Sequence, residues 1–128
     1  VGAIALFAGL LYVVITSREV VGTSAPMEGA NHVDEGSVIV YQNVPPSSGP
    51  HYPVTAPYGI AEQPIPAGYW VHNLEHGGIA VLYQCEADCS GLVNELKDAF
   101  VKLPRSKVFN RVKLVATPYA DMIFSFTC

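Results

Sequence analysis

Proline dominates one stretch of this 128-residue chain and limits what the chain can fold into. Seven of the ten prolines fall within residues 43–69, where the tract PPSSGPHYP begins at Pro45. Proline fixes φ and lacks a backbone N–H, so this tract cannot form a regular helix. A long stretch without regular structure in a compact domain is usually either functional or disordered. Four aromatic residues between Tyr52 and Trp70 favour an ordered, packed loop.

Apolar patterning around this loop predicts short strands and one helix. Segments rich in β-branched and aromatic residues are typical of strands. The predicted strands are residues 37–42, 78–84, 112–117 and 122–127. Ser90 suits a helix N-cap, residues 91–103 carry one apolar face, and Pro104 follows them. We therefore expect an α+β fold, a small and mostly antiparallel sheet with one packed helix and a long Pro/Gly-rich loop.

Composition and charge exclude several classes of protein. Half of the residues are hydrophobic and 14% are charged, which fits neither a disordered tail nor a coiled coil. The net charge of −4 excludes a bulk electrostatic grip on nucleic acid. Six bases and one acid lie between Lys97 and Lys113. This stretch is interpreted as a solvated helix and loop, or as a basic face that docks on a partner or on anionic headgroups.

The opening segment predicts attachment to a membrane. Residues 1–16 carry no charge, and a bilayer crossing needs about 20 apolar residues. Residues 1–17 are therefore predicted to be a transmembrane anchor that begins before Val1. A cleaved signal peptide and a pilin stalk are the alternatives. Residues 18–36 are predicted to be a linker, and residues 37–128 an α+β domain on the periplasmic or extracellular side.

The three cysteines, Cys85, Cys89 and Cys128, support a location outside the cytoplasm. There, Cys85 and Cys89 are most simply a disulfide, although either can pair with Cys128 instead. Cys-x3-Cys is also the spacing of two copper sites, the dinuclear centre of oxidases and the chaperones that serve it. The oxidase centre needs a histidine four residues after the second cysteine, where this chain has Val93.

All four histidines lie within 45 residues of the Pro/Gly-rich half. Imidazole is the commonest metal-binding side chain, and it is neutral enough to bind near pH 7. His72 and His76 are four residues apart, which puts both rings on one face of either a helix or a strand. The prolines before His51 can hold it against that pair at low entropic cost. The sequence predicts His51, His72 and His76 as metal ligands, with His32 as a fourth.

Other interpretations of the histidines remain open. They can be loop residues that hydrogen-bond to backbone groups, or acid–base catalysts. HNLEH is not the HExxH motif of zinc proteases, and Glu75 is expected to point away from the two-histidine face. We therefore expect Glu75 to support a ligand or to cap the helix at most. Ser47 and Ser48 lie near His51 without a nucleophile signature, so no catalytic residue is predicted.

Several motifs together resemble a known bacterial family. These are HV at position 32, VIVYQNVPPSSGPHY from Val38, VHNLEHGGIAVLY from Val71 and TPY from Thr117. The chain resembles, from about Asn31 onward, the family catalogued as domain of unknown function 3105. The resemblance implies one N-terminal membrane helix, a domain outside the cytoplasm and no assigned activity. The family's recurrent histidines match His32, His51, His72 and His76, whereas the Cys85/Cys89 pair is not part of its pattern.

The predicted function is that of a membrane-anchored, extracytoplasmic metal-binding domain without its own turnover. Copper is the first choice, because the Irving–Williams order favours Cu²⁺ over Zn²⁺ for nitrogen ligands, and zinc is the second. The alternative is a metal-free accessory subunit of a larger membrane complex. The expected partners are the membrane and other subunits of such a complex, and not nucleic acid.

Overall fold

The computed structural model describes residues 22–121 of the chain. The predicted anchor at residues 1–17, the predicted strand at residues 122–127 and Cys128 lie outside the described residues. Within the described part, no helix combines the length and apolar character that a membrane crossing requires.

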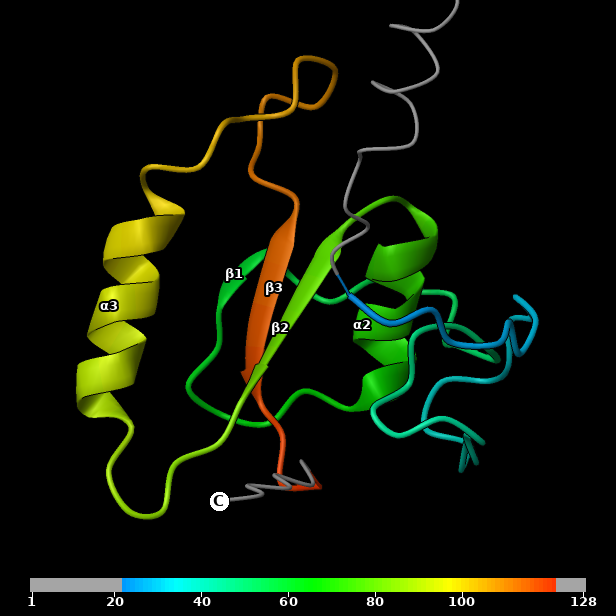
Figure 1. The fold of residues 1–128 in the computed structure, drawn as a ribbon. Helices are drawn as coiled ribbons and strands as arrows, with labels where there is room; N and C mark the ends of the chain where they lie inside the picture. The colour runs from blue at the N-terminus through cyan, green and yellow to red at the C-terminus, as the bar shows by residue number, and fades with distance from the viewer. Residues whose placement is uncertain (1–21, 122–128) are drawn as a thin grey trace, which may run out of the picture.

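The described residues form a small sheet flanked by two helices (Figure 1). In chain order the elements are β1 (Gly59–Ile60), α2 (Ala67–Glu75), β2 (Ile79–Tyr83), α3 (Ser90–Phe100) and β3 (Leu114–Pro118). The strand order is β1-β3-β2, and both pairs of neighbours are parallel. Gly59 pairs with Val115, and Ile79 with Leu114, so the last strand of the described chain lies in the centre.

The α+β class is confirmed, but the predicted antiparallel arrangement is wrong, and the described residues contain two packed helices in place of the predicted one. Helix α3 carries the chain back along the sheet between β2 and β3, which is the kind of connection that parallel neighbours require. The predicted strands at 78–84 and 112–117 correspond to β2 and β3. Their apolar sequences fit a sheet that is covered on both sides.

The two helices cover opposite faces of the sheet (Figure 1). Val115 of β3 belongs to a core cluster with Trp70 and Val71 of α2. The next residue, Ala116, belongs to a second cluster with Val93 of α3. Successive strand residues face opposite sides, so β3 supplies one buried side chain to each core. Helix α3 is close to its predicted extent, although Cys89 and not Ser90 occupies the N-cap.

The predicted strand at residues 37–42 does not form. The segment is extended and alternates in burial, with Ile39 and Tyr41 facing the domain and Val38 and Val40 exposed at 93% and 83%. A strand also needs a hydrogen-bonded neighbour, and within residues 22–121 no strand pairs with this segment. The β-prone sequence therefore gives an extended edge segment that packs on one side only.

The Pro-rich stretch at residues 43–69 contains more regular structure than the sequence suggested. Strand β1 lies inside it, and α2 begins at Ala67, directly after the last proline of the stretch. The PPSSGPHYP tract itself forms no helix, as predicted. Tyr52 and Trp70 are buried, which confirms the expectation of an ordered, packed loop.

Two glycines end helix α2 and direct the chain into β2. The Gly77 N–H donates to Leu74 O at 2.9 Å and the Gly78 N–H donates to Asn73 O at 2.7 Å, the bond pattern of a Schellman motif. Gly77 has φ +69°, a left-handed conformation that glycine adopts at low cost. His76 is consequently the C-cap residue, at the end of α2 where the candidate site lies.

Candidate metal centre

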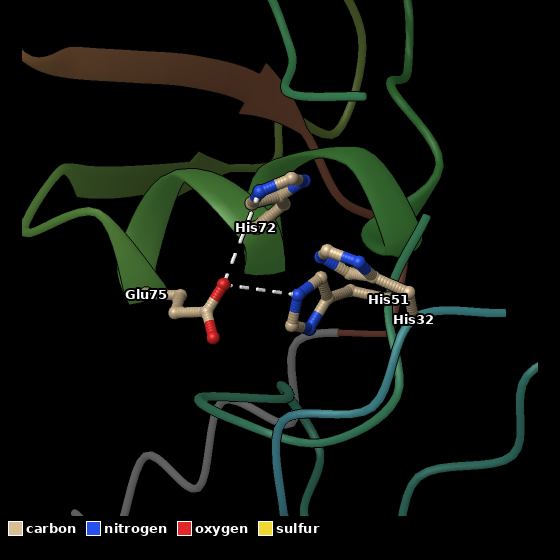
Figure 2. A group of neighbouring side chains, drawn as sticks. All are labelled: His32, His51, His72 and Glu75. Atoms are coloured by element: carbon tan, nitrogen blue, oxygen red, sulfur yellow. Dashed lines mark ion pairs between the residues drawn. The ribbon is translucent and has the colours of Figure 1, made fainter. Parts of the chain in front are cut away.

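Three histidines and one carboxylate from distant parts of the sequence meet at the C-terminal half of α2 (Figure 2). One nitrogen or oxygen atom from each of four side chains lies within 4.8 Å of the other three. The four residues are His32, His51, His72 and Glu75. His51 and His72 are 1% and 6% exposed, whereas His32 and Glu75 face solvent. Such a group could hold a metal ion between its two buried and its two exposed side chains.

His32 and His51 are placed side by side by their backbones. The two residues form an isolated parallel β-bridge. Within it the His51 N–H donates to Asn31 O, and the Val33 N–H donates to His51 O, both at 2.9 Å. The two rings have centroids 4.9 Å apart. The bridge therefore places the exposed imidazole of His32 beside the buried imidazole of His51.

Helix α2 supplies the other two members of the group, His72 and Glu75. The prediction that Glu75 points away from the histidines is wrong. At about 100° per residue, residues 75 and 76 lie on either side of residue 72 around the helix, so both can approach it. The sequence prediction considers only the (i, i+4) pair of His72 and His76. On a helix, (i, i+3) neighbours such as His72 and Glu75 also lie side by side.

Backbone carbonyls fix the proton positions on the two buried histidines. His51 Nδ1 lies 2.9 Å from Gly49 O, and His72 Nδ1 lies 2.8 Å from Tyr52 O. A carbonyl oxygen only accepts, so each Nδ1 is the donor. In the neutral rings each Nε2 therefore carries a lone pair. Metal-binding histidines are commonly oriented in this way, with the other ring nitrogen donating to a carbonyl.

The Nε2 atom of His51 lies close to a carboxylate oxygen. His51 Nε2 is buried and makes no hydrogen bond with any described residue, yet Glu75 Oε2 lies only 3.2 Å away. Glu75 Oε2 is also 3.9 Å from His72 Nε2 (Figure 2). Two acceptors at this separation need a cation between them, either a proton or a metal ion.

These separations suit a small metal ion. An ion held at about 2.0–2.2 Å from each ligand atom keeps tetrahedral ligand atoms about 3.3–3.6 Å apart. The 3.2 Å between His51 Nε2 and Glu75 Oε2 is close to that spacing, and the 3.9 Å between His72 Nε2 and Glu75 Oε2 closes with a small side-chain rotation. A hollow of about 330 Å³ is bordered by both His51 and Glu75, and it gives an ion a path to them from solvent.

His76, the remaining predicted ligand, lies beside the group and is not one of its four members. Its Nε2 is 2.9 Å from His72 Nε2, and the two rings are stacked with centroids 4.8 Å apart. Because His72 Nε2 is an acceptor when neutral, His76 donates this hydrogen bond. A metal bound to His72 Nε2 would take over the same lone pair, so His76 must then turn away or join the ion.

Burial favours the neutral form of His72. The pKa of His72 lies below its ordinary value of 6.5, mainly because desolvation disfavours the imidazolium form. The hydrogen bond to Tyr52 O opposes this effect, and the charges of His51, His76 and His32 add to it. A histidine must be neutral to bind a metal, so the local environment favours the binding form.

Cys85 and Cys89 lie elsewhere in the fold. Cys85 and Cys89 form a disulfide with each other, as predicted, at the turn between β2 and α3. Both sulfurs are therefore bonded and supply no thiolate, which removes the copper-thiolate alternatives for this pair.

Comparison with known proteins supports the family resemblance. The family described as "Protein of unknown function (DUF3105)" matches residues 32–124. No curated protein and no solved structure matches the chain. The family match covers more than half of the chain and contains all four histidines and Glu75. The chain therefore belongs to the DUF3105 family of proteins of unknown function.

Proposed function

We propose that this protein binds one divalent transition-metal ion through His51, His72 and Glu75, with His32 as the fourth ligand. The observation that carries the proposal is the buried His51 Nε2, which has no hydrogen-bond partner among the described residues although a carboxylate oxygen lies 3.2 Å away. A protonated His51 would form an ion pair with Glu75, but this contact lacks hydrogen-bond geometry. A metal ion satisfies both acceptors at once.

Copper is the metal we propose first, and zinc second. Three imidazole nitrogens and one carboxylate oxygen suit either ion, and the Irving–Williams order places Cu²⁺ above Zn²⁺. The thiolates that Cu⁺ prefers are absent from the described group. We therefore propose binding of the divalent ion, with the protein acting as a binding domain and not as a catalyst.

We further propose that the domain acts outside the cytoplasm, attached to the membrane by residues 1–17. The Cys85–Cys89 disulfide supports this location, because such bonds persist in oxidising compartments. The uncharged segment at residues 1–16 supports the attachment.

A metal-free structural role is the competing proposal, in which the domain is an accessory subunit of a membrane complex. Its support is the pair of Nδ1 hydrogen bonds, which tie α2 and the His51 loop to backbone carbonyls without any ion. In that case the histidines join chain segments, and the Nε2 atoms have no ligand function. The two proposals differ in whether the purified protein retains stoichiometric metal.

Metal retention by matched variants tests the proposal. The full chain in neutral detergent is stripped with a chelator, loaded with Cu²⁺ or Zn²⁺, desalted and analysed for metal content. We expect about one ion per chain for the wild type, and at least a tenfold loss of affinity for Glu75→Gln, since loss of a ligand removes a charge-assisted contact. His51→Ala should abolish retention.

Glu95→Gln is the control, because it makes the same chemical change at an exposed position on α3. It should retain metal like the wild type. If the wild type retains no more metal than His51→Ala, the metal proposal fails and the structural role is favoured.

A further inference from the structure

A second hollow, of about 370 Å³, lies next to the candidate metal-binding residues His32, His51, His72 and Glu75, here called the metal group. The hollow differs from this group in chemistry. It is bordered by Thr55, Tyr58, His76, Phe109, Arg111 and Lys113. His76 connects the two places, because it borders this hollow and its Nε2 lies 2.9 Å from His72 Nε2 of the metal group. The hollow therefore opens beside the metal group without including any of its four members.

The charge of this hollow is positive although the chain is acidic overall. The net charge of the protein is −4, yet the described residues that line the hollow include an arginine, a lysine and a histidine and no acid. Arg111 forms no ion pair within residues 22–121. With no carboxylate of residues 22–121 paired to it, its guanidinium can present donors to a planar anion such as a carboxylate.

The walls of the hollow are held in place by other contacts. The Lys113 ammonium donates to the His76 carbonyl and lies 5.0 Å from the centroid of the Phe109 ring. The turn that presents Arg111 is closed by a hydrogen bond from the Ser106 N–H to Arg111 O at 2.8 Å. Asn110 adopts a left-handed conformation within this turn, with φ 49°. The Lys113 ammonium, the Phe109 ring and the backbone at Arg111 are therefore held in place before a ligand binds, which lowers the cost of binding.

We propose that this hollow binds a small organic acid with an apolar or aromatic body. Arg111 and Lys113 would receive the carboxylate, the Thr55 and Tyr58 hydroxyls offer further donors, and the Tyr58 and Phe109 rings would contact the body of the ligand. The acid would lie beside His76, at the edge of the metal group. Neither cation belongs to the metal group, so this site can be tested separately in metal-free protein.

Titration with benzoate, followed by NMR of the full chain, tests the site. The protein is stripped of metal and desalted, because a residual polycarboxylate chelator would compete. Benzoate should shift the backbone amide signals of Thr55, Phe109 and Arg111. Arg111→Gln should raise the Kd at least about tenfold, since hydrogen bonds to charged groups are strong.

Lys107→Gln is the matched control, because it removes the same charge from an exposed position in the same basic stretch, outside the lining of the hollow. It should change the Kd less than about twofold. Equal losses in the two variants would show that general charge attracts benzoate and would overturn the proposal. Inorganic phosphate should bind more weakly than benzoate, and equal or tighter binding would overturn the assignment to an organic acid. An unchanged amide spectrum outside the hollow confirms that each variant is folded.

Discussion

Asn73 joins helix α2 to the Pro-rich loop through a single side chain. It is fully buried, and its amide accepts from the Ala56 N–H at 2.8 Å and donates to Ala56 O at 2.9 Å. Both backbone groups of Ala56 lie in a loop without a strand partner, so the asparagine takes the place of a neighbouring strand. Ala56 is itself part of the core cluster that contains Trp70.

Replacing Asn73 by Ala should destabilise the fold by about 1–3 kcal/mol, because Ala56 O loses its donor and the Ala56 N–H keeps only its longer bond to Tyr69 O at 3.3 Å. Asn94→Ala is the control, since Asn94 is exposed on α3 and its loss should change stability by less than about 0.5 kcal/mol. Urea unfolding followed by far-ultraviolet circular dichroism measures both variants. Equal stability of the two variants would contradict the bridging role of Asn73.

At the scale of elements, helix α2 lies unusually close to the loop that carries His51. A Cβ atom placed on Gly68 would lie 2.6 Å and 2.7 Å from two ring carbons of Tyr52. Tyr52 is buried, its hydroxyl donates to Ser37 O, and its carbonyl accepts from His72 Nδ1. The glycine thus permits the approach that orients one of the buried imidazoles.

Gly68→Ala should therefore destabilise the fold by about 1–3 kcal/mol, since the Tyr52 ring must move in a packed core. Gly91→Ala on α3 meets open space, and it should be neutral or stabilise by up to about 1 kcal/mol. Thermal unfolding of the two alanine variants and the wild type measures the difference. The prediction is wrong if Gly68→Ala unfolds at or above the wild-type temperature.

For the whole molecule, the buried imidazole of His72 connects stability to pH. Burial lowers the pKa of His72 in the folded state below its ordinary value of 6.5. Below that value the unfolded chain binds a proton at this side chain that the folded protein does not bind. The stabilising contribution is therefore present above about pH 6.5 and is lost as the pH falls toward the lowered pKa.

Metal-free protein should consequently be less stable at pH 5.5 than at pH 7.5. His72→Gln keeps an amide donor for Tyr52 O but removes the titrating group, so its stability should depend less on pH. Urea unfolding of the wild type and of His72→Gln at both pH values measures the free energy of unfolding in each case. An equal pH dependence in wild type and variant would show that His72 is not responsible.

Local sequence determined much of the secondary structure and the residue types of the site. Strands β2 and β3 follow from apolar runs, and α3 follows from its apolar face and Pro104, because these signals lie within a few residues of each other. The disulfide followed from the short spacing of Cys85 and Cys89. Four histidines in one Pro/Gly-rich half indicated a site there, since prolines fix loops that can bring distant side chains together.

Only the tertiary structure decided the pairing of elements and the membership of the metal group. Residues 37–42 have a strand-like sequence, but a strand needs a partner, and the parallel sheet forms around β3 instead. Glu75 lies beside the histidines because α2 begins at Ala67 and continues to Glu75. A helix brings the side chains of residues 75 and 76 to either side of residue 72. His32 reaches His51 through a backbone bridge between segments nineteen residues apart in sequence, and such long-range pairing depends on packing that no local pattern encodes.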